Sequence, residues 1–174
     1  MDLAHTHLIL NHIPVIGIPV ALAFLIHGTY IKNDSSQRFA FFVLVCLALI
    51  VLPVYFTGEP AEKVVEHLPG VAEPFIEAHE DAALFSLILT LLTGVTAFFA
   101  LWFQKNPKIG RRLNFGVMGA ASLALLSLMY TANLGGKVRH TEVRSGSPNQ
   151  SGGELQGEIE SSQMSLTTML TPKD

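Results

Sequence analysis

The sequence predicts an all-α integral membrane protein, a four-helix up-down bundle, from its charge content, the distribution of those charges and the length of its connectors. Only 14% of the 174 residues are charged, whereas soluble domains carry about 25%. The charged residues lie almost wholly outside four apolar segments, 8–31, 39–56, 82–103 and 113–136. About 20 apolar residues cross a bilayer as one helix, and these segments lack the alternation of barrel strands. Four consecutive spans with two short connectors indicate antiparallel neighbours.

The segments follow one another with distinct connectors. Residues 32–38 join the first two spans, and residues 104–112 join the last two. The longer segment 57–81 contains Pro60 and Pro74, each preceded by Glu, which is typical of the first turn of a helix. We therefore expect two short interfacial helices between the second and third spans.

The C-terminal part differs in composition from the rest of the chain. Residues 143–174 are rich in Ser, Gly, Gln and Glu, and such a segment is too polar to build a core. The expected division is a transmembrane domain over residues 1–142 and a disordered tail over 143–174.

The basic residues predict which way the bundle faces. Connectors 32–38 and 104–112 hold six Lys and Arg residues, whereas segment 57–81 holds only Lys63. Short loops rich in Lys and Arg stay on the inner side of a membrane. Both chain termini and segment 57–81 are therefore expected outside. The net charge of −3 gives no sign of nucleic-acid binding.

Histidine is unusually abundant, with seven residues, and the predicted topology gathers six of them at the outer face. The six are His5, His7, His12, His67, His79 and His140. Only His27 falls at the inner side. His12 lies within the first span, and an imidazole inside a span usually has a partner or a task.

This placement predicts a non-covalent haem b that transfers electrons. Six-coordinate haem iron needs two axial ligands, which two imidazoles from facing helices can supply. The apolar side chains of the helices would pack against the porphyrin. His12 and His79 form the first ligand pair, with His140 as the main substitute, and Lys137 and Arg139 are candidate partners of the haem propionates. No Cys-x-x-Cys-His string is present, so covalent c-type attachment is excluded.

Small residues in the fourth span predict close helix contacts. Gly135 and Gly136 allow the close approach of a neighbouring group or a flat ligand, and Gly116, Gly119 and Ala120 form a patch suited to tight helix packing.

Four strings support a resemblance: NHIP in the first span, FTG after the second, EAHEDAAL at the third and NLGGKVRH at the end of the fourth. Across residues 5–142 the chain resembles a family of small, largely uncharacterised bacterial four-helix inner-membrane proteins, similar to a b-type cytochrome bundle. The resemblance implies that His12, His79, Arg139 and His140 form a shared site for haem or a metal. It also implies the bacterial inner membrane, so that the outer side, where the basic residues place both termini, is the periplasm.

Two other classes of function stay open. His12, His79 and His140 with Glu77 and Glu80 offer the nitrogen and oxygen ligands of a zinc, iron or copper site without porphyrin. Alternatively, the chain is an accessory subunit of a larger membrane complex. Segment 57–81 and the tail would then contact other membrane or periplasmic redox proteins. The sequence shows no recognisable catalytic nucleophile or pair of catalytic acids, which favours an electron carrier or an accessory subunit over a stand-alone enzyme.

Overall fold

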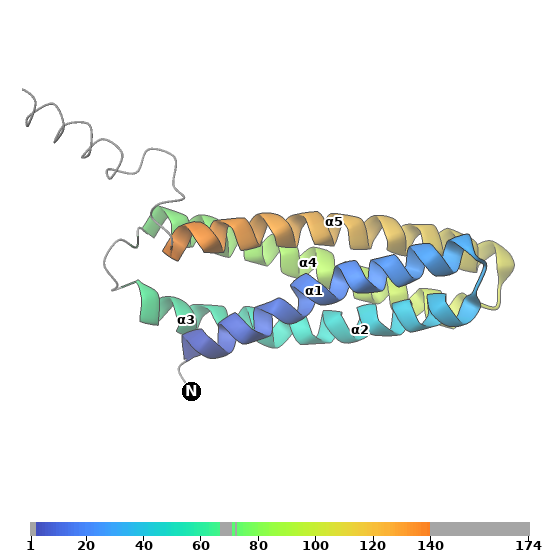
Figure 1. The fold of residues 1–174 in the computed structure, drawn as a ribbon, viewed down its shortest axis with the longest axis horizontal. Coiled ribbons are helices and arrows are strands. Elements are labelled where there is room, and N and C mark those ends of the chain that lie inside the picture. The colour runs from blue at the N-terminus through green and yellow to red at the C-terminus, as the bar shows by residue number, and fades with distance from the viewer. Residues whose placement is uncertain (1–2, 67–70, 72, 140–174) are drawn as a thin grey trace, which may run out of the picture.

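The structure, a computed structural model, describes residues 3–66, 71 and 73–139, and within these ranges the regular structure is helical. In Figure 1 the long helices lie side by side, and the short helix lies at an end of the bundle. The elements in chain order are α1 (Leu3–Tyr30), α2 (Asp34–Phe56), α3 (Gly58–Val65), α4 (Glu73–Phe103) and α5 (Pro107–Arg139). The predicted all-α four-helix bundle is confirmed.

The four long helices pack in the cyclic order α1, α2, α4, α5. The most extensive contacts join α4 to α5, α1 to α2 and α2 to α4, while α5 closes more loosely onto α1. Helix α3 packs against α1 and α2. We call the end of the bundle that holds α3, the start of α4 and the end of α5 the histidine end, and the opposite end the connector end (Figure 1).

The helices are apolar on their outer as well as their inner surfaces. Ile18, Leu25, Phe41 and Val117 are almost completely buried, yet the side chains of Trp102 and Leu126 are 74% and 64% exposed. A helix that is hydrophobic all round is suited to lipid. Each of the four long helices is long and apolar enough to span a membrane, which indicates a multi-pass membrane protein.

Two helices approach each other closely where α2 meets α4. A Cβ atom built on Gly94 would lie 2.2 Å from the Cβ of Ala48, so only glycine fits at this crossing. By contrast, Gly116 and Gly119 have open space where a Cβ would be. The expectation that Gly116 and Gly119 mediate tight packing was therefore wrong for contacts among the residues that the structure describes.

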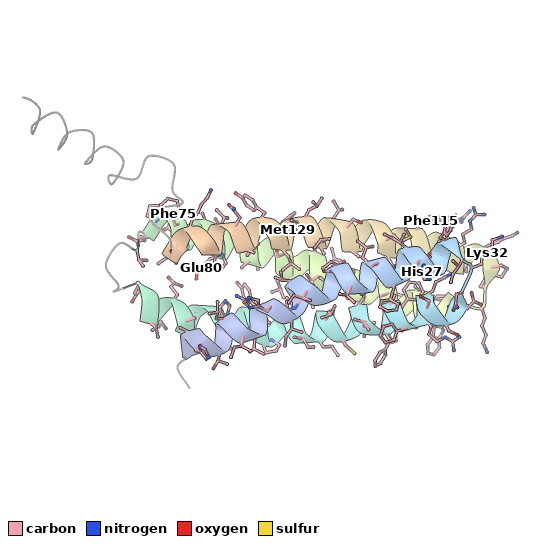
Figure 2. The ribbon with its side chains drawn as sticks, viewed as in Figure 1. His27, Lys32, Phe75, Glu80, Phe115 and Met129 are labelled. Carbon is pink, nitrogen blue, oxygen red and sulfur yellow. The ribbon has the colours of Figure 1, made fainter. Side chains whose placement is uncertain are left out.

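The connector end is closed by two short turns. Lys32 has a φ of 54°, and Asn33 caps α2 by accepting a hydrogen bond from the amide of Ser36. The side chain of Arg38 donates to Gln104 across the two connectors at 3.0 Å. Figure 2 shows His27 and Lys32 at this end and Glu80 at the other. His27 therefore lies at the opposite end of the bundle from Glu80, as the predicted topology expects.

The segment between the second and third spans differs from the prediction. One short helix, α3, is separate, but the second expected helix is the first part of α4, which continues without a break from Glu73 to Phe103. Nothing after Pro74 interrupts the helix, because Pro74 is its second residue and the following polar residues tolerate helical geometry. The expected tail, residues 143–174, lies outside the described residues.

Candidate functional site

His79 is held by the backbone of the neighbouring helix. Its Nδ1 atom lies 3.0 Å from the carbonyl oxygen of Thr131 on α5. A carbonyl oxygen can only accept, so Nδ1 carries the proton and donates it to Thr131. A Cβ atom on Gly135 would lie 3.0 Å from Cε1 of this imidazole, so α5 comes close to His79 because Gly135 has no side chain. The close approach predicted at the glycine pair is confirmed at Gly135.

A hydroxyl network fixes the turn of α5 that receives this hydrogen bond. The Oγ atom of Ser86 on α4 lies 2.9 Å from Oγ1 of Thr131 and 2.6 Å from Oγ of Ser127. Ser86 is seven residues after His79, so the two side chains share a face of α4. His79 and Ser86 therefore join α4 to α5 at consecutive positions along one face.

His7 has the same kind of support from α2. Its Nδ1 atom lies 3.1 Å from the carbonyl oxygen of Val54 and 3.1 Å from Oγ1 of Thr57. Thr57 Oγ1 in turn donates to the carbonyl oxygen of Val54 at 2.8 Å. A Cβ on Gly58 would come within 3.7 Å of His7 Cε1. The Thr-Gly string after α2 thus lies around His7.

His7 was missed as a ligand candidate, although the sequence carries a signal for it. Its neighbours on the inner face of α1 recur at helical spacing, at Pro14, Ile18, Ala21 and Leu25, all of which are buried. Spacings of seven, four, three and four residues place His7 on that face. His7 is half-buried, while His12, five residues further on, is exposed.

The two supported histidines approach each other from opposite sides of the bundle. Helices α1 and α4 are diagonal in the packing order, yet His7 and His79 are close enough for an electrostatic interaction between their rings. Because each Nδ1–H donates to a carbonyl oxygen, the Nε2 atom of each neutral imidazole keeps its lone pair. This state of the ring is the one that binds a metal, and a carbonyl partner for the other nitrogen is the usual outer support of a metal-bound histidine.

Two carboxyl groups meet at the same end. Glu62 of α3 and Glu80 of α4 form a side-chain hydrogen bond, which requires one proton between them. This bond raises the pKa of Glu62 to about 7, and partial burial and the negative charges of Glu80, Glu66 and Glu59 add to the rise. Figure 2 shows Glu80 at this end of the bundle. The pair links α3 to α4.

The remaining site candidates are distributed differently from the prediction. His12 is exposed and its Nδ1 donates to the carbonyl oxygen of Leu8 on its own helix, so no described contact joins it to His79. Glu77 is exposed, and Lys137 is half-buried near the end of α5. Arg139 is the last residue of α5, and His140 lies outside the described residues.

A protein-bound metal ion without porphyrin would need a third ligand beside the two histidines. Among residues 3–66, 71 and 73–139, no group of three or more His, Cys, Asp and Glu side chains could hold a metal ion. The described part of the site therefore offers two histidines close enough to interact electrostatically and a separate carboxyl pair. Comparisons with protein-family models, with curated proteins and with solved structures give no match, so no family is identified for this chain.

Proposed function

We propose that this chain is a multi-pass membrane protein that binds one non-covalent haem b at the histidine end and transfers electrons through it. The proposed axial ligands are His7 and His79. His7 takes the position that the sequence assigned to His12, while His79 keeps its predicted role. The proposal places the histidine end at the outer, periplasmic side of a bacterial inner membrane.

One observation carries the proposal: both imidazoles donate Nδ1–H to a main-chain carbonyl oxygen, His7 to Val54 and His79 to Thr131. This fixes the tautomer and leaves Nε2 of each ring as the ligating atom. The two rings come from diagonal helices of an apolar bundle, which is the arrangement that axial ligation by two histidines uses.

The number of protein ligands at the site fits haem better than a metal ion without porphyrin. Haem iron takes four ligands from the porphyrin and needs only two from the protein, whereas structural and catalytic zinc sites take three or four protein ligands. The described residues hold no group of three suitable side chains. Lys137 and Arg139 follow Gly135 at the end of α5, where cations would pair with the propionates.

Absorption spectroscopy of the full chain in mild detergent tests the proposal. After expression with ample haem supply, we expect a Soret band that shifts on reduction with dithionite. His79→Ala and His7→Ala should each abolish the six-coordinate spectrum. His12→Ala and His5→Ala are matched controls, because both side chains lie on α1 and are exposed, and they should keep it.

A ligand substitution separates a ligating role from a structural one. His7→Met should retain haem with a raised reduction potential, because methionine–histidine ligation raises the potential of haem iron. Folded but colourless wild-type protein would overturn the proposal in favour of an accessory subunit. Loss of haem in His12→Ala but not in His7→Ala would restore the ligand pair expected from the sequence.

A further inference from the structure

A second site candidate lies away from the His7 and His79 pair, on the outer surface where α1 and α2 run side by side (Figure 1). It is an open groove of about 470 Å³ that begins at His12 and passes Ile16, Gly17 and Val20. Phe24 and Phe39 line its other end, where their rings meet edge to face with centroids 5.2 Å apart.

The length of the groove suits a long apolar chain. Its α1 wall extends from residue 12 to residue 24, which at 1.5 Å per residue is about 18 Å. Except for His12, the residues that line the groove are apolar. A long apolar chain fills such a space, while a compact polar ligand would leave its own polar groups unpaired.

His12 defines the chemistry of the head group. Its Nδ1–H donates to the carbonyl oxygen of Leu8, so Nε2 is an acceptor that can pair with a donor on a ligand. No Lys or Arg occurs in residues 1–31 or in residues 39–62, so both walls lack a cation for a phosphate head group. The complementary ligand is therefore uncharged and donates a hydrogen bond. A phenolic hydroxyl is a stronger donor to imidazole than an aliphatic one, because it is more acidic.

We propose that this groove binds a long-tailed membrane quinol, with a quinol hydroxyl donating to Nε2 of His12 and the tail lying along α1 toward Phe24 and Phe39. The inference does not depend on haem, because His12 contacts its own helix and not the His7 and His79 pair.

Binding measurements on the full chain in lipid nanodiscs, carried out under anaerobic conditions, test the head group. The probes are a decyl-substituted benzoquinol, the corresponding quinone with the same tail, and a long-chain alcohol. Loss of one neutral hydrogen bond corresponds to a factor of roughly two to ten in affinity, so the quinol should bind more tightly than the quinone by about that factor. Equal binding of quinol and quinone, or of quinol and alcohol, would overturn the proposal.

Two variants with matched controls locate the site. His12→Phe keeps an aromatic ring but removes the acceptor, and should lower quinol affinity to the level of the quinone. Ile16→Trp fills the groove and should weaken both ligands. Ile26→Trp is its control, because Ile26 is also exposed on α1 but does not line the groove. Quinol binding that is unchanged in His12→Phe or in Ile16→Trp would refute the assignment.

The same variants separate this proposal from the haem proposal. His12→Phe should lose the preference for quinol and keep the haem spectrum, whereas His79→Ala should lose the spectrum and keep quinol binding. Quinol binding that disappears in His79→Ala but persists in His12→Phe would assign the ligand to the histidine end and overturn the groove.

Discussion

The Nδ1 atom of His79 lies 3.0 Å from the carbonyl oxygen of Thr131, so the backbone of α5 fixes the orientation of an imidazole that belongs to α4. The position of the ring therefore depends on how closely α5 approaches, and that approach depends on Gly135.

The first prediction concerns this glycine. A methyl group in Gly135→Ala would lie 3.0 Å from Cε1 and 3.3 Å from Nδ1 of His79, so the ring must move and its hydrogen bond to Thr131 weakens. We expect a stability loss of about 1 kcal/mol relative to the control, together with a lowered haem occupancy. Gly136→Ala is the control, because a Cβ there meets nothing within 4 Å. Thermal unfolding in detergent measures the difference. Equal stability of the two variants would contradict it.

The second prediction concerns the hydroxyl network between α4 and α5. Ser86→Ala removes the bonds to Ser127 and Thr131, and hydrogen bonds between membrane helices contribute about 0.6 kcal/mol on average. A double-mutant cycle of Ser86→Ala with Ser127→Ala should give a coupling energy of about that size. Ser122→Ala should be nearly neutral, because Ser122 is exposed and bonds only to Met118 of its own helix. A vanishing coupling would show that the network does not join the helices.

The third prediction concerns the crossing of α2 and α4. Gly94→Ala places a methyl group 2.2 Å from the Cβ of Ala48, which forces the helices apart and should cost about 1–3 kcal/mol. The double variant Gly94→Ala, Ala48→Gly moves the methyl group to the other helix and should recover part of the loss. Gly119→Ala, with open space at its Cβ position, should change the unfolding temperature little. Failure of the double variant to recover stability would exclude a local clash as the cause.

The fourth prediction is a pH dependence at α3. The pKa of Glu62 is raised in the folded protein from 4.5 to about 7, so its contribution is fully present below pH 4.5 and is lost as the pH rises through about 7. Hydrogen exchange of the α3 amides, corrected for intrinsic rates, should therefore increase between pH 5 and pH 8.

Two variants control this experiment. Glu62→Gln donates to Glu80 at every pH and should remove the dependence. Glu59→Gln should preserve it, because Glu59 pairs with the exposed Lys63 at 2.7 Å and is only a minor contributor to the shift at Glu62. The same pH dependence in Glu62→Gln as in the wild type would assign it to another group.

The sequence predicted the helices better than their ends. Long uncharged segments identify spans because lipid excludes charge, but the polar residues that flank them form helix equally well. Helix α4 therefore begins at Glu73, nine residues before the apolar segment that starts at Ala82. Similarly, small residues alone did not reveal which helix face meets a neighbour: Gly94 does, and Gly119 does not.

The candidate site was predictable in part. His79 was identified from the sequence because it lies at the start of a predicted span. Its hydrogen-bond partner, the carbonyl oxygen of Thr131, was not identified, because the sequence shows only that the fourth span is a neighbour of the third. His12 was favoured over His7 because it lies deeper in the apolar segment. The side of α1 that faces inward depends on packing with α2, and only the buried positions at Pro14, Ile18 and Leu25 place His7 on that side.

Among neighbouring long helices the contacts are weakest between α1 and α5, and the two imidazoles are supported on opposite sides of this interface: His7 of α1 bonds to α2, and His79 of α4 bonds to Thr131 of α5. At the connector end, the side chain of Asn114 on α5 donates a hydrogen bond to Thr29 of α1 at 2.9 Å and joins the two helices there. Opening of the α1–α5 interface at the histidine end would change the separation of the two rings without breaking either Nδ1 bond. A ligand bridging His7 and His79 would therefore hold this interface closed, coupling occupancy of the site to the rigidity of the bundle.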